Sequence, residues 1–162
     1  LPDGSPSDFT ARRYLREAKG GSAIIWFEAI SIVPEGRSSA TQLYLCRENL
    51  DSYKRLTQAV KEAGLQVNGF APYLVMQANH SGRYSNPDNK PAPIIAYRHP
   101  ELEQYRAADN SCIVTDDYLK ALEEKFGSKM RSARQRSMKQ TILWSHRALV
   151  FTTATHGRMA SA

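Results

Sequence analysis

Two apolar runs joined by a helix-periodic segment are the feature that most constrains how this 162-residue chain can fold. The first run, Ala23–Phe27, is interrupted by Glu28 and resumes over residues 29–33, and the second covers Tyr73–Met76. Short apolar runs of this kind are typical of buried strands in parallel sheets. Between them, the segment Arg47–Gly64 predicts a helix that ends near its glycine. Its apolar residues recur at helical spacing: Leu50, Tyr53, Leu56, Val60 and Ala63.

The order strand, helix, strand is the unit of a parallel sheet with a crossover helix. We therefore predict that residues 23–33 and 73–78 are adjacent parallel strands, with a helix over 47–63 as their connection. Both strands would then present polar ends, Glu28-Ala29 and Gln77–His80, on the same edge of the sheet. Because α/β folds bind ligands at the carboxyl ends of their strands, this edge is a candidate site. A core strand followed by an ordinary polar loop is the alternative.

Two motifs in these segments resemble the old yellow enzyme family, the flavin-dependent NADH:flavin oxidoreductases. The segment YLVMQANHSGRYS (residues 73–85) resembles the family pattern Q-L-x-H-x-G-R, and AIIWFEAISIVPEGR (residues 23–37) resembles G-L-I-x-T-E-A-x-x-V-x-P-x-G-R. Two later stretches, PIIAYRHPELE and CIVTDDYLKALEEKF, resemble the region that leads to the next helix. The similarity runs in order from about Leu1 to Phe126.

The resemblance implies a (β/α)8 TIM barrel that binds flavin mononucleotide (FMN) at the carboxyl ends of its strands. It assigns to Gln77 a hydrogen bond with the pyrimidine edge of the flavin, and it sets Ala29 against the flavin near its reactive edge. The implied activity is hydride transfer from NADH or NADPH through the flavin to a small electron-poor acceptor, often an activated alkene. An amide suits Gln77 because it can donate and accept hydrogen bonds at once.

Each of these residues also has a structural interpretation. Gln77 could bond a neighbouring backbone group, and Glu28 at the end of a buried strand should be paired or hydrogen-bonded whatever its role. His80 and Arg83 are more often structural in such a loop, where they would order it against the next helix. Two aromatic residues could face a flavin, although core packing is the favoured interpretation for both: Trp26 and Tyr84.

The length of the chain is short for such a barrel, which typically needs ~250 residues. The sequence begins at Leu1-Pro2-Asp3-Gly4, which resembles the loop after the first strand of the family. We therefore expect an α/β fold that is part of a barrel, incomplete at both ends and inactive by itself. Residues 1–126 would form the partial flavin-binding barrel. Uncovered strand edges would favour self-association.

Charge separates the last part of the chain from the rest. All 16 acidic residues lie within residues 1–124, together with 14 Lys and Arg, whereas residues 125–162 hold 8 basic residues and no acidic one. Helical periodicity also fades after Phe126. Residues 127–162 are therefore interpreted as a basic tail that either continues the barrel or has an aberrant sequence, as after a reading-frame shift. The alternative function is a non-catalytic module that binds nucleic acid or an acidic partner through residues 125–162.

The tail holds one further candidate. The segment LVFTTATHGRMAS (residues 149–161) resembles the family strand whose histidine helps to bind substrate, which places a substrate-binding role on His156. The acid and the lysine of that pattern are replaced by Phe151 and Thr153.

Other classes of site find little support in the sequence. Cys46 and Cys112 are far apart and lack CxxC spacing, so we expect no metal site and no redox pair. No Walker loop or GxGxxG motif is present. No aromatic platform lies among the basic residues, so nucleic-acid binding is the less favoured interpretation. There is no stretch of 18 apolar residues, and a membrane partner is not expected. The cysteine usage and the cofactor-enzyme resemblance suit the cytoplasm.

Overall fold

The computed structural model describes residues 1–103, 108–135 and 140–142. These residues form a mixed α/β fold around a parallel sheet with the strand order β1-β2-β3. In chain order the elements are α1 (Asp8–Lys19), β1 (Ile24–Ser31), η1 (Pro34–Gly36), α2 (Leu50–Asn68), β2 (Tyr73–Asn79), η2 (Gly82–Tyr84), α3 (Pro100–Glu103), η3 (Asn110–Cys112), α4 (Asp116–Gln135) and β3 (Gln140–Ile142).

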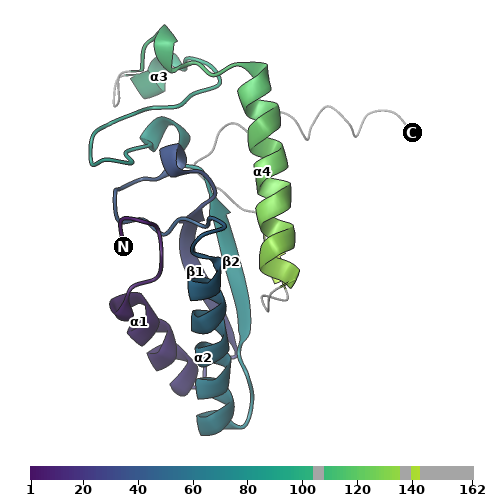
Figure 1. Ribbon diagram of the computed structural model, residues 1–162. Coiled ribbons are helices and arrows are strands. Elements are labelled where there is room, and N and C mark those ends of the chain that lie inside the picture. The colour runs from purple at the N-terminus through teal and green to yellow at the C-terminus, as the bar shows by residue number, and fades with distance from the viewer. Residues whose placement is uncertain (104–107, 136–139, 143–162) are drawn as a thin grey trace.

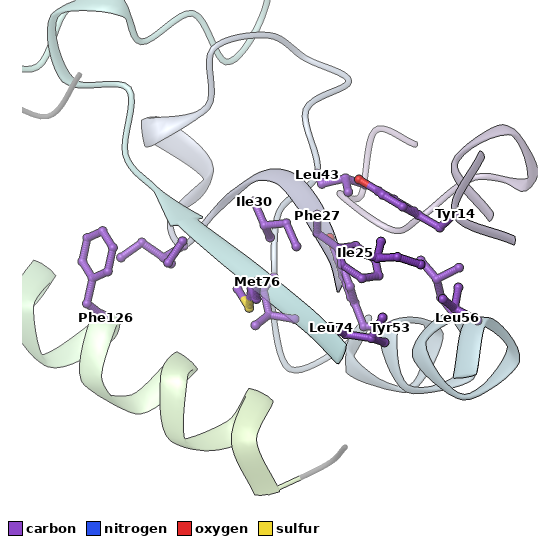
Figure 2. Close-up of a cluster of buried hydrophobic side chains, with 14 of the residues drawn as sticks. Tyr14, Ile25, Phe27, Ile30, Leu43, Tyr53, Leu56, Leu74, Met76 and Phe126 are labelled. Atoms are coloured by element: carbon purple, nitrogen blue, oxygen red, sulfur yellow. The ribbon is translucent and has the colours of Figure 1, made fainter. Parts of the chain in front are cut away.

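The predicted strand–helix–strand unit is confirmed. Strand β1 pairs with β2 in parallel, and α2 is the helix that connects them. In Figure 1, α1 and α2 lie beside each other along the strands, and α4 runs along β2. One face of the sheet packs against all three helices, and Figure 2 shows side chains from both strands and from α4 converging there. This face supplies the apolar burial that stabilises the unit.

The ends of α2 differ from those predicted. The helix begins at Leu50 and continues past Gly64 to Asn68. Gly64 therefore lies inside the helix and does not end it. Its lack of a side chain makes room for Pro72, because an added Cβ would lie 2.6 Å from the proline Cδ. The stop comes instead at Gly69, whose φ of 78° is a left-handed conformation that favours glycine.

The change in charge and periodicity near residue 126 lies inside helix α4. The helix runs from Asp116 to Gln135. The Nζ of Lys129 donates a hydrogen bond to the Leu45 carbonyl (2.8 Å) and lies 5.7 Å from the centre of the Tyr44 ring. A helix can continue without an apolar stripe where its residues have good helix propensity, as Lys, Met, Arg, Ala and Gln do.

The third described strand, β3, lies before residues 149–161. The sequence predicts a family-like strand at residues 149–161, and these residues are outside the described part of the chain.

A β-bulge in β1 sets the register of the sheet. Trp26 pairs with Val75, but the next paired residue is Ala29, which pairs with Gln77. Two residues of β1, Phe27 and Glu28, therefore lie opposite the single residue Met76 of β2. Such a bulge leaves a backbone N–H out of the ladder. The Glu28 N–H donates instead to the hydroxyl of Tyr14 on α1 (2.8 Å), which also accepts from Arg13 (3.0 Å). Glu28 itself pairs with Arg13, as expected for a strand-end carboxylate.

We predict that Tyr14→Phe lowers the free energy of unfolding by about 1–3 kcal/mol, because it leaves the bulge N–H without a partner. Urea unfolding followed by circular dichroism measures the change. Tyr73→Phe is the matched control, since no partner within the described residues bonds the buried Tyr73 hydroxyl. That variant should be neutral or slightly more stable. Equal losses in the two variants would contradict the capping role of Tyr14.

The opposite face of the sheet carries exposed apolar side chains. Ile24 is 65% exposed and Trp26 47% exposed. Apolar surface beside a strand edge promotes pairing between chains. We therefore propose that the chain self-associates through this face, and that Ile24→Lys weakens the association while the fold is kept.

Sedimentation velocity over a range of protein concentrations measures the effect of Ile24→Lys. The matched control is Val67→Lys, which places the same charge on a similarly exposed residue (59%) of α2. A parent chain that stays monomeric at high concentration, or an equal effect of both substitutions, would show that this face is not the contact.

Candidate functional site

The polar ends of β1 and β2 lie together at one edge of the sheet, as predicted, and they border a pocket. Ala29 and Gln77 are paired across the two strands and both line this pocket, which has a volume of about 310 Å³. Seven residues form its described wall: Ala29, Ser38, Gln42, Gln77, Asn79, Ser81 and Tyr84. All seven have uncharged side chains, so the described part of the wall offers amides and hydroxyls without a formal charge.

The loop after β1 forms one wall of the pocket. The Gln42 side chain spans from strand to loop: its Nε2 donates to the Ala29 carbonyl (2.9 Å), and its Oε1 accepts from the Ser38 N–H (2.6 Å). Arg37 fixes the base of the loop by donating to the carbonyls of Pro2 (3.0 Å) and Ala40 (3.1 Å). These bonds satisfy backbone groups that an irregular loop would otherwise leave unpaired.

The end of β2 and the segment after it form another part of the wall. Asn79 donates from Nδ2 to the Ser81 hydroxyl (3.2 Å), so both side chains are held at the pocket rim. The Ser81 N–H in turn donates to the Gly36 carbonyl (2.8 Å), which ties this wall to the turn that follows β1. The two strand ends therefore share a hydrogen-bonded frame.

His80 lies behind this wall and does not line the pocket. Its side chain is only 1% exposed, and its ring packs so close to Gly36 that an added Cβ there would lie 2.6 Å from His80 Cδ2. Nδ1 accepts from the Gly82 N–H (3.0 Å), so the ring proton is on Nε2, which donates to the Tyr118 hydroxyl (3.0 Å). Tyr118 donates to Glu35 (3.4 Å). His80 thus orders the loop against α4, which is the structural role expected from the sequence.

Arg83 is also buried, and its guanidinium donates to the Tyr97 carbonyl (3.3 Å). It lies outside the wall of the pocket. The expected structural role of Arg83 therefore agrees with its contacts.

Burial lowers the pKa of His80 to about 4, and the nearby charge of Glu35 opposes this shift only in part. The ring is therefore neutral at pH 7. The unfolded chain, with an ordinary histidine pKa near 6.5, binds a proton first as the pH falls. The stability that depends on neutral His80 is complete above pH ~6.5, decreases as the pH falls toward 4, and changes no further below it.

We predict that His80→Asn reduces the pH dependence of unfolding between pH 6.5 and 4. In the parent, protonation in the unfolded state should remove about 3 kcal/mol across this range. The variant, although less stable at pH 7, should lose less over the same interval. Urea titrations at several pH values provide the measurement, and parallel curves for parent and variant would contradict the buried neutral histidine.

The interpretation of Trp26 and Tyr84 as core residues is wrong. Tyr84 is half-buried and lines the pocket. Trp26 lies on the exposed face of the sheet, where its indole N–H donates to the side-chain amide oxygen Oε1 of Gln77 (3.0 Å). The alternation of faces along β1 could have revealed Trp26, because its neighbours Ile25 and Phe27 are the buried ones. No comparable pattern marks Gln42 or Ser38, which lie in an irregular loop.

His156 lies outside the described residues. Among the described residues, no group of three or more His, Cys, Asp and Glu side chains could hold a metal ion. No helix within that part of the chain combines the length and the apolar composition needed to cross a membrane.

Solved structures with the same arrangement include members of the old yellow enzyme family, the family that the motifs resemble. The fold matches 2-naphthoyl-CoA reductase in complex with 2-naphthoyl-CoA, with a TM-score of 0.69 at 16% identity over 86% of this chain and 22% of that one. It matches a variant of morphinone reductase in complex with tetrahydroNAD, with a TM-score of 0.64 at 16% identity over 88% and 41%. For the old yellow enzyme homologue from Zymomonas mobilis, the TM-score is 0.61 at 18% identity over 88% and 40%.

These likenesses show the fold: the described residues have the architecture of one part of an old yellow enzyme-type barrel. The chain spans about two fifths or less of the length of these three structures. Neither a protein-family model nor a curated protein sequence matches it.

Proposed function

We propose that this chain is part of an FMN-dependent oxidoreductase. In this proposal, hydride passes from NADH or NADPH through FMN to a small electron-poor acceptor such as an activated alkene. The observation that carries the proposal is the pairing of Ala29 with Gln77 at the strand ends, in a pocket whose described wall residues are uncharged. The motif resemblance assigns these same two residues to the flavin, and the solved structures with this fold include flavin-dependent family members.

The chemistry of the pocket fits a flavin ring. Ala29 has a small side chain, so a planar ring could lie against the strand end, and its carbonyl is already bonded by Gln42. Gln77 offers an amide that can meet a carbonyl and an adjacent N–H. When bound, FMN would supply the hydride chemistry, and the protein would bind the ring, orient it and exclude water.

The remaining parts of the function are proposals on the same basis. The substrate-binding role of His156, the acceptor and the choice of nicotinamide all follow from the resemblance. The 162-residue chain alone is proposed to bind FMN without turnover, since the rest of a barrel would normally contribute to the site. The alternative of a basic interaction module is less favoured, because Lys129, one of its charged residues, already bonds Leu45.

We predict that Gln77→Ala weakens FMN binding about five- to 150-fold, because it leaves a polar edge of the ring without a partner at a cost of ~1–3 kcal/mol. Gln77→Glu should weaken it further at neutral pH, since a carboxylate cannot donate to a flavin carbonyl. Titration of FMN followed by quenching of its fluorescence measures the affinities.

Gln58→Ala is the matched control for this prediction. It removes an amide of the same type from the exposed face of α2, where Gln58 bonds Glu62, and should leave FMN affinity unchanged. Circular dichroism verifies that all variants keep the fold. The proposal fails if the parent binds no FMN at saturating concentration, or if both Gln77 variants bind it as tightly as the parent.

A further inference from the structure

Trp26 is an unusual residue for its position on the sheet. It occupies the unspecified position of the G-L-I-x-T-E-A pattern and lies on the exposed face of β1. Trp26 is 47% exposed, so core packing does not account for a large aromatic residue at this position. Its polar atom, however, has a specific partner in Gln77.

The bulge in β1 explains how Trp26 reaches Gln77. Side chains alternate between the two faces of a regular strand, so residues 26 and 29 would normally point to opposite faces. The extra residue in the bulge shifts this alternation, and Trp26 and Ala29 both face the side of Gln77. Trp26 pairs with Val75, two residues before Gln77, which places the indole diagonally across from the amide.

The direction of the hydrogen bond determines what Gln77 offers to a ligand. The indole N–H can only donate, so the Gln77 oxygen Oε1 must be the atom that accepts from it. The opposite end of the amide, the Nε2 group with its two N–H donors, then remains for the pocket. Oε1 keeps one lone pair, which could accept from an adjacent ligand N–H.

We propose that Trp26 is the positioning residue of this site: it fixes the Gln77 amide so that Nε2 donates to a ring carbonyl of the ligand. The ligand class is a planar heterocycle that has a carbonyl beside an N–H. The proposal rests on the proposed function, with the flavin as that heterocycle. Without the indole N–H, the two orientations of the amide become closer in energy. Part of the binding free energy is then used to select one of them.

The first experiment tests the contact without any ligand. In a Trp144→Phe background, Trp26 gives the single indole N–H resonance in a nitrogen–proton NMR spectrum. Gln77→Ala should move this resonance toward the position of a free indole, and Trp26→Phe should shift the side-chain amide resonances of Gln77. An indole resonance that Gln77→Ala leaves in place would overturn the proposal.

The second experiment is a double-mutant cycle on FMN affinity with Trp26→Phe, Gln77→Ala and the double variant. Trp26→Phe keeps an aromatic ring but removes the donor, and should weaken FMN binding about twofold to tenfold. If Trp26 acts through Gln77, the same substitution should have no effect in the Gln77→Ala background. A loss of equal size in both backgrounds would mean that Trp26 acts independently, and would overturn the proposal.

Ile24→Val is the matched control for the cycle, because Ile24 lies on the same face of β1, opposite Tyr73. It should leave FMN affinity and the Trp26 resonance unchanged. If the parent chain binds no FMN, the proposed function fails, and the indole and amide resonances alone decide whether Trp26 holds Gln77. The two failures are therefore distinguishable.

Discussion

The bulge in β1 is the constraint on which the candidate site depends. With regular pairing beyond Trp26 and Val75, Glu28 would lie opposite Gln77 and its carboxylate would face the pocket. The bulge moves Ala29 into that place and leaves Glu28 to pair with Arg13. A one-residue shift exchanges the two faces of a strand, so the same bulge returns Ile30 to the buried core. The hydroxyl of Tyr14 satisfies the N–H that the bulge releases, which makes helix α1 part of the support of the site.

The absence of formal charge among the described wall residues follows from this arrangement. Burying an unpaired charge is costly, and charged groups near the strand ends are directed elsewhere. Glu28 turns toward α1, Arg37 bonds backbone carbonyls of the N-terminal segment and its own loop, and His80 is held neutral beneath the wall. A pocket bordered by amides and hydroxyls can hold the polar edge of an uncharged ring without desolvating an ion. Such a pocket orients its ligand through hydrogen bonds and does not attract it through a formal charge.

The sequence predicted the elements that periodicity encodes and missed those set by tertiary contacts. The strand–helix–strand unit and the shared edge of Ala29 and Gln77 follow from apolar runs and helical spacing, and both are present. The end of α2 was misplaced because a glycine can serve close packing, here against Pro72, as well as a helix stop. Glu28 was recognised as an interruption of the strand, but whether an interruption becomes a bulge depends on Tyr14, which lies 14 residues away.

The fold alone does not establish what this chain does, because one architecture supports many activities. The likeness to old yellow enzyme-type structures covers 86–88% of this chain, at 16–18% sequence identity in the three structures compared. The link to flavin is narrower: it rests on an alanine and a glutamine that a bulge brings opposite each other. Trp26 adds a feature that the family pattern leaves unspecified, a donor that gives the glutamine one orientation. Any function of this edge therefore depends on the local geometry of β1 more than on the barrel architecture that surrounds it.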